Sequence, residues 1–346
     1  MIELLNDQLS FSFGDVHPDA KLGIEFQRTL RIPDDGDSHL LPPGLGNFPV
    51  CHVDDFADKV SEQWLKRGGV IFPMYQSEAL WLNFNGKHVH DRNTSYPFAI
   101  KVAAGKINAV SGEGWGKGIK QDPQDYMVSN KQPWLDGYCV GNGSIRQFVA
   151  MPLGSGYSAE EQISGEAEHG GLQIEVYPMK REVFERNFPK RDSRAWECQS
   201  RYVLGTQAWL CEAPGSPDMG LAPGGKMRQQ VYHDPFDIHS WDLENSSRCY
   251  VHIANSLVWQ AITGKVPPSP PPTARQYSKA GLPWFDYYSD AKSVGGSSIL
   301  DKLKSVVTLG REKGDNPLPE NASAPPEKVI VLRDGLGKNE VRDGAF

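Results

Sequence analysis

The chain has 346 residues, enough for one large domain or two ordinary ones, and its formal net charge is −7. No run of lysine and arginine exceeds two residues, which argues against a nucleic-acid partner. No apolar run approaches the roughly 18 residues that span a membrane. The N-terminus is acidic where a signal peptide needs basic residues. We therefore expect a cytoplasmic protein, and a vacuolar or granule-like inclusion remains an alternative location.

Glycine and proline are frequent, with 35 and 26 residues, and this favours short strands joined by turns over long helices. In the N-terminal part, alternating apolar residues predict six strands. The clearest helix is expected over 54–67, because Phe56, Val60 and Trp64 fall four residues apart and Gly68 follows as a stop. The predicted strands are 9–13, 22–26, 70–72, 79–84, 98–102 and 106–110.

The central third shows the strongest strand pattern. In 172–177, Leu172, Ile174 and Val176 point one way while polar residues point the other, so we expect one face on a core and one toward polar surroundings. A capping box at Ser158 predicts a short helix, and a second is expected over 180–188. Further strands are predicted at 144–151, 202–204, 208–210, 227–232 and 249–253.

Beyond residue 265 the composition changes. Residues 266–272 include five prolines and are expected to be extended. The aromatic cluster at 284–288 would be costly in water, so we expect it to dock on the body. A helix is predicted over 298–309 and a strand over 328–332.

Together these elements predict a mainly β, antiparallel sandwich-like fold with a few short peripheral helices. It is either one large sandwich or two abutting ones. Residues 1–265 would form the body; if it consists of two sub-domains, they would divide near 118–135. Residues 266–346 would form a proline-rich linker, an aromatic docking segment, a short helix and a tail, and would pack back on the body.

Catalytic motifs are not apparent. Gly154-Ser155-Gly156 lacks the outer spacing of a nucleophile elbow, and no glycine-rich phosphate-binding loop follows a strand. The histidines that approach metal-ligand spacing, His88 with His90 and His233 with His239, lie in polar or turn-like sequence, where such pairs are usually solvated. We predict no catalytic residue, no metal site and no cofactor.

Two features leave a carbohydrate ligand open. Acidic residues at 160–161 and 166–168 could supply the two carboxylates of a glycoside hydrolase, although Glu161 is also explained by helix capping. Trp81, Trp134 and Trp284 are candidate ligand-stacking aromatics. The alternative interpretation places these rings in the core.

The chain has five cysteines, and no two of them are spaced as in a CxxC zinc motif. One interpretation is buried, reduced thiols. The other is crosslinking between molecules, since an odd thiol lacks an intramolecular partner. The candidate intermolecular thiols are Cys51, Cys139, Cys198, Cys211 and Cys249.

Four segments also carry a family resemblance: 124–126, 132–137, 146–152 and 170–173. As a set, and together with 281–286, they resemble a family of uncharacterised β-rich proteins found in bacteria and fungi. The chain is also similar to the fungal vacuolar crystal-forming proteins of bacterial origin, the OCTIN type. That resemblance implies ordered self-assembly, reinforced by cysteine crosslinks, and it assigns no catalytic residues.

The sequence thus predicts a non-enzymatic, self-associating protein whose partner is another copy of itself, as a homo-oligomer or an ordered array. The alternative is a carbohydrate-binding protein or glycoside hydrolase.

Overall fold

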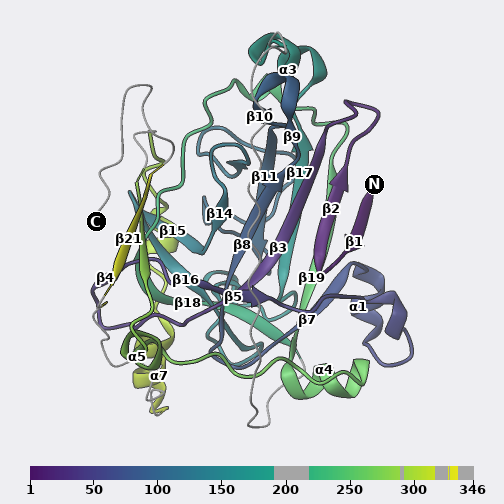
Figure 1. The fold of residues 1–346 in the computed structure, drawn as a ribbon. Coiled ribbons are helices and arrows are strands. Elements are labelled where there is room, and N and C mark those ends of the chain that lie inside the picture. Colours follow the sequence, from purple (N-terminus) through teal and green to yellow (C-terminus); the bar gives the residue numbers. More distant parts are fainter. Residues whose placement is uncertain (191–217, 289–291, 316–325, 327, 334–346) are drawn as a thin grey trace.

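The computed structural model describes residues 1–190, 218–288, 292–315, 326 and 328–333, and everything below concerns these residues. The fold is mainly β, with several sheets and short helices. In Figure 1 the helices lie at the ends and edges of the strands. They are α1 (Glu62–Arg67), α2 (Ala159–Ser164), α3 (Arg181–Asn187), α4 (Ser256–Thr263), α5 (Ala274–Lys279), α6 (Ser298–Asp301) and α7 (Val306–Lys313).

The larger sheet has ten strands in the described part of the chain. Its main path runs through β1 (Ile2–Leu5), β2 (Gln8–Ser12), β3 (Lys21–Thr29), β8 (Ala79–Gly86), β16 (Ser144–Pro152), β18 (Met219–Arg228) and β4 (Ser38–His39). Three further strands pair at its sides: β5 (Gly44–Asn47) with β3, β14 (Trp134–Leu135) with β8, and β15 (Gly137–Gly141) with β16.

The second large sheet has seven strands in the same described ranges. Its path runs through β12 (Ile107–Asn108), β11 (Phe98–Ala104), β17 (Leu172–Pro178), β19 (Ser247–Asn255), β7 (Val70–Met74) and β6 (Cys51–His52), and β13 (Met127–Val128) pairs with β11. Two small sheets pair β9 (His88–Val89) with β10 (Thr94–Ser95), and β20 (Trp284–Tyr288) with β21 (Val329–Arg333).

Residues of both large sheets belong to one hydrophobic cluster. The rings of Phe26 on β3 and Phe72 on β7 lie 5.0 Å apart between centroids, and Phe48 stacks on Phe72 at 4.9 Å. The alternation predicted for β17 is confirmed in that Leu172, Ile174 and Val176 join this cluster; Tyr177, assigned to the polar face, joins it too.

Most strand pairs are antiparallel, as expected, but three are parallel. One parallel pair joins β19 to β7 over five residue pairs. Some 170 residues separate these strands in the chain, so the connection is long enough for a parallel crossover. The large sheets are therefore mixed, with parallel pairs that the antiparallel expectation did not include.

The helix expected over 54–67 is two shorter pieces, a 3-10 turn (Asp54–Phe56) and α1. Ser61 adopts an extended conformation and its side chain accepts a hydrogen bond from the backbone of Trp64, so it starts a new helix. Ser305 divides the helix expected over 298–309 in the same way, into α6 and α7. The helices α4 and α5 were not predicted.

Of the strand expected over 227–232, only residues 227–228 lie in a strand, at the end of β18, which begins at Met219 and ends at Arg228. The Pro223 and the three glycines of β18 do not suit a central strand, and they obscured it in the sequence. A register shift opposite β16 accommodates the proline. A Cβ on Gly225 would lie 2.3 Å from the carbonyl oxygen of Pro33, so the close backbone approach requires glycine there. The strands expected at 202–204 and 208–210 lie outside the described residues.

The C-terminal segment packs back on the body, as predicted. Ala274 and Tyr277 of α5 and Trp284 of β20 share a hydrophobic cluster with Leu41 of the body. The backbone of Phe285 exchanges two hydrogen bonds with Leu41, at 2.9 and 3.0 Å. Figure 1 shows β21 at the same side of the molecule as β4.

Candidate functional site

The structure brings two of the three candidate stacking tryptophans together and buries the third. Trp81 on β8 and Trp134 on β14 are partly exposed and pack edge to face, with ring centroids 6.5 Å apart. Trp284 is only 2% exposed, and its indole N–H donates to the hydroxyl of Ser278. Trp284 is thus a core residue, as the alternative interpretation held.

Strand pairing explains why Trp81 and Trp134 meet. Trp134 pairs with Asn83, which lies two residues beyond Trp81 on β8. Side chains two residues apart in a strand share a face, so the two indoles lie diagonally across the ladder on the same side. Gly44 packs against Trp81: a Cβ there would lie 3.2 Å from the indole.

These rings line a pocket of about 340 Å³, which we call the aromatic pocket. The volume is at the lower end of the range for small-ligand sites. The lining is mostly apolar and includes Phe285 and Leu332 from the small C-terminal sheet. The lining residues are Leu41, Pro42, Pro43, Gly44, Trp81, Trp134, Asp136, Phe285 and Leu332.

Asp136 is the one acidic residue among those lining residues. It is 2% exposed, and burial raises its pKa to about 7. Gln229 holds it from two directions: the amide nitrogen donates to the carboxylate at 2.7 Å, and the amide oxygen accepts from the Asp136 backbone at 3.0 Å. Near neutral pH, Asp136 can therefore either donate or accept one hydrogen bond.

Several residues that line the aromatic pocket were not predicted as functional from the sequence. Phe285 was recognised only as part of a docking cluster, while Pro42, Pro43 and Leu332 attracted no functional interpretation. Asp136 was missed because its raised pKa arises from burial between strands far apart in sequence. The one available signal was the tryptophan that precedes it by two residues, on the next position of the same face.

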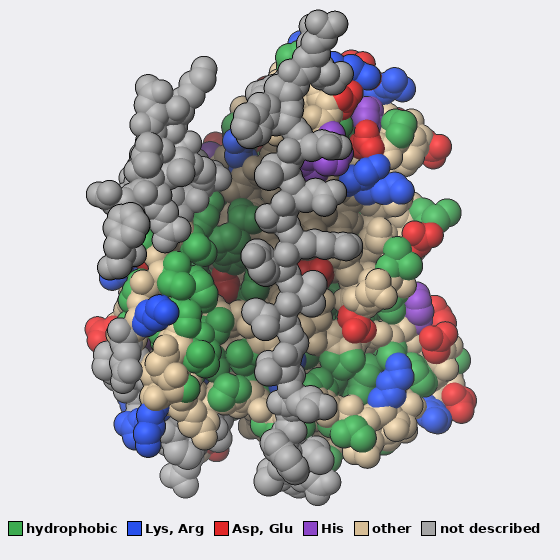
Figure 2. Space-filling view, viewed as in Figure 1, with side chains coloured by type: hydrophobic (Ala, Val, Ile, Leu, Met, Phe, Trp, Pro, Cys, Tyr) green, Lys and Arg blue, Asp and Glu red, His purple; other side chains and the backbone are tan. Residues whose placement is uncertain are grey.

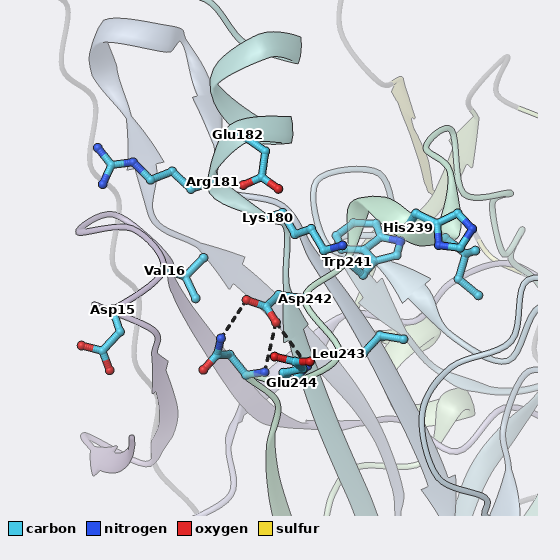
Figure 3. A pocket seen from close by; sticks show the side chains of 12 residues that line it. Asp15, Val16, Lys180, Arg181, Glu182, His239, Trp241, Asp242, Leu243 and Glu244 are labelled. Carbon is cyan, nitrogen blue, oxygen red and sulfur yellow. Dashed lines mark hydrogen bonds between the residues drawn. The ribbon is translucent and has the colours of Figure 1, made fainter.

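A second pocket, of about 680 Å³, lies where β17 meets α3 (Figure 3). It is lined by His239, one of the histidines that approach metal-ligand spacing in the sequence, and by Asp242. The Asp242 carboxylate instead accepts hydrogen bonds from the backbone of Glu244 at 3.2 Å and from Asn245 (Figure 3). Within the described ranges, no three His, Cys, Asp or Glu side chains gather to hold a metal ion.

Three of the five cysteines are described, and all three are free thiols in buried positions. Burial raises the pKa of Cys139 and of Cys249 to about 12. The thiol of Cys51 lies 3.2 Å from the amino group of Lys265. Cys198 and Cys211 lie outside the described residues, so crosslinking between molecules stays a prediction.

No family model matches the chain, and no match was found among curated proteins or among solved structures. None of the helices that the structure describes is both long enough and apolar enough to cross a membrane.

Proposed function

We propose that this chain is a non-enzymatic protein that associates with further copies of itself through the apolar surface around β20 and β21. The observation that carries this proposal is an exposed apolar strand beside an apolar hollow. Val329, Val331 and Leu332 of β21 are 44%, 56% and 40% exposed, and Leu332 also lines the aromatic pocket. Figure 2 shows hydrophobic side chains gathered on this side of the molecule.

Exposed apolar surface of this kind favours association. Burying it against another molecule would contribute about 25 cal/mol per Å² of apolar area removed from water. Contiguous apolar patches on a protein surface often mark interaction sites. The strand of one copy can also contact the hollow of the next, which gives a head-to-tail interface. Such interfaces form open assemblies when they do not close into a ring.

Strand geometry supports the same proposal. Among the described strands β21 pairs with β20 alone, through five parallel residue pairs. The opposite edge of such a strand presents backbone N–H and C=O groups that a strand of a second copy could pair with. Its side chains are apolar at four of the five positions, Val329 to Leu332.

The self-association proposal is tested by sedimentation velocity over a wide concentration range, with and without reductant. We expect species larger than the monomer whose fraction grows with concentration. Val331→Lys should shift the protein to monomer, because a charge on the strand opposes pairing. Val266→Lys is the matched control, since Val266 is 64% exposed and belongs to the proline-rich segment rather than to β21, and it should change nothing.

Strict monomer at every concentration, in both redox conditions, would contradict self-association. Equal effects of the two valine substitutions would contradict the assignment to β21. A loss of large species only on reduction would indicate crosslinking instead. Because Cys51, Cys139 and Cys249 are buried, such crosslinking would then be assigned to Cys198 or Cys211.

A second candidate function is carbohydrate binding, favoured by the pairing of Trp81 with Trp134 around Asp136. Indole faces stack on apolar faces of sugars, and a carboxyl group can bond a hydroxyl. Glycoside hydrolysis would need two carboxyl groups flanking the bond, and Asp136 is the single acid among the described lining residues. A glycan array would test this function, with Trp81→Leu expected to abolish any binding.

We also infer that the two large sheets pack face to face as a sandwich. Contacts such as Phe26 with Phe72 join β3 of the larger sheet to β7 of the second. Phe13, just beyond β2, also lies 5.8 Å from Phe98 of β11 between ring centroids. An experimental structure in which these ring pairs are separated would overturn the sandwich.

A further inference from the structure

A pocket of about 590 Å³ lies against the polar face of the seven-stranded sheet, between the end of α1 and the turn that follows β11. We call it the cationic pocket. Four of its described lining side chains are cationic, Lys66, Arg67, Lys106 and Arg248, and none is acidic. The whole chain carries a net charge of −7, so the positive charge of this pocket is opposite in sign to that of the chain.

Arg67 is held in a fixed orientation without a carboxylate partner. Its guanidinium donates to the backbone oxygens of His169 and Glu168, at 3.2 and 3.1 Å, and to the hydroxyl of Tyr250 at 3.3 Å. It also lies over the Tyr250 ring, 5.1 Å from the centroid. In the part of the chain that the structure describes, no carboxylate lies within 4.0 Å of it. Neutral acceptors thus position the group but leave its charge unbalanced.

One acid that interacts electrostatically with Arg67 is Asp218. Burial raises the pKa of Asp218, while the positive charge of Arg67 opposes that rise. Its carboxylate is also engaged by the side chain of Trp64. Asp218 is not among the residues that line the cationic pocket, so it does not occupy the position of a ligand.

A buried carboxylate fixes the loop that holds Arg67. Glu160, 1% exposed, accepts hydrogen bonds from the backbone and the ring of His169, at 3.2 and 3.0 Å, and from the backbone of Gly170 at 2.9 Å. This carboxylate therefore sets the loop whose carbonyl groups hold Arg67. Such support makes the arrangement preformed, and a ligand would not have to order it.

We propose that the cationic pocket binds a small oxyanion of the phosphate class. Arg67 would supply a fixed fork of N–H donors, and Lys66, Lys106 and Arg248 would add flexible charge around it. Lys106 pairs only loosely with Glu166 and Glu168, at 3.4 and 3.7 Å, so it can turn toward a ligand.

The walls also suit a flat group attached to the oxyanion. Trp115 and Tyr250 both line the pocket, and Trp115 is partly exposed. The ammonium of Lys101, one of the most buried charges of the sheet, lies 5.1 Å from the Trp115 ring and helps to hold it. An aromatic phosphate ester would gain stacking energy that inorganic phosphate would not.

The test is isothermal titration of the full chain with inorganic phosphate and with phenyl phosphate. We expect binding that weakens with rising salt. Arg67→Gln should raise Kd about tenfold or more, because a charge-assisted hydrogen bond contributes about 1.5–3 kcal/mol. Arg248→Gln leaves the Glu160 loop untouched and should raise Kd by a smaller factor, so it serves if Arg67→Gln does not fold. Arg181→Gln is the matched control, an arginine 61% exposed on α3, and should not alter Kd.

Three results would overturn the proposal: no heat with either probe, equal Kd in all variants, or a change in Arg181→Gln as large as in Arg248→Gln. Tighter binding of phenyl phosphate that Trp115→Leu removes would identify the ligand as an aromatic ester. Equal affinity for both probes would identify it as the free oxyanion.

Discussion

The aromatic pocket and the cationic pocket differ in the chemistry of the residues that line them. The first, on the ten-stranded sheet, joins indole rings and an acid whose pKa is raised by burial, Asp136. The second, on the seven-stranded sheet, collects cations around a guanidinium that neutral oxygens hold. Apolar surface favours burial by a partner, whereas uncompensated charge favours a counter-ion. Each pocket therefore predicts its own response to mutation and to pH.

Trp284→Ala should give the largest effect. Trp284 belongs to the small C-terminal sheet and is fully buried, so its removal should lower the free energy of unfolding by about 3–5 kcal/mol. Trp81→Ala removes a ring that is partly exposed and should cost distinctly less. Chemical denaturation of both variants measures the difference. Equal costs would mean that Trp81 is a core residue like Trp284, and the aromatic pocket would lose its binding role.

Asp136 should make the protein less stable as pH rises. Its pKa in the folded state is about 7 against 3.8 when unfolded, so the folded state binds the extra proton between these values. A shift of that size corresponds to about 4 kcal/mol, lost progressively from pH 4 to pH 7. Asp136→Asn should remove this pH dependence in denaturation measured at pH 5 and pH 7.5. An unchanged slope would show that the carboxylate is already ionised in the fold.

His252, beside the cationic pocket, should have the opposite effect and make the protein less stable as pH falls. Burial lowers its pKa from 6.5 to about 4, while its ring packs on Trp64 and donates to the backbone oxygen of Gly68. The unfolded state then binds the extra proton, so about 3 kcal/mol of stability is lost as pH falls from 6.5 to 4. His252→Gln should be less stable at neutral pH but flatter over this range. The same acid slope in both proteins would assign the loss to other groups.

The sequence predicted much of the strand content because alternation is a local signal, as in β17, where Leu172, Ile174 and Val176 reach the core. The predictions were wrong where the local preference of a residue differs from the conformation that its tertiary contacts require. Pro223 and Gly225 are unfavourable in a strand, yet they lie in β18, where the neighbours of Gly225 leave no room for a Cβ. Helix ends were misjudged where a single serine, Ser61, starts a new helix.

The candidate sites were harder to predict because each is assembled from distant segments. Trp81 and Trp134 could be singled out as residues, but only strand pairing shows that they meet, and only packing shows that Trp284 does not join them. The cationic pocket left no sequence signal. Arg67 and Arg248 are 181 positions apart, and neither lies in a basic cluster longer than two residues.

Lys106→Gln should have the smallest effect on the free energy of unfolding. It therefore tests whether the charge of Lys106 serves ligand binding or the stability of the fold. The lysine is 38% exposed and its partners Glu166 and Glu168 are 50% and 60% exposed, so these ion pairs should contribute less than about 1 kcal/mol to unfolding. Phosphate affinity should nevertheless fall, because the lost charge faces the pocket. If denaturation instead showed a cost above about 1 kcal/mol with phosphate affinity unchanged, Lys106 would be a structural cation. Phosphate binding would then depend on Arg67, Lys66 and Arg248 alone. The cationic pocket would differ less in charge from the aromatic pocket.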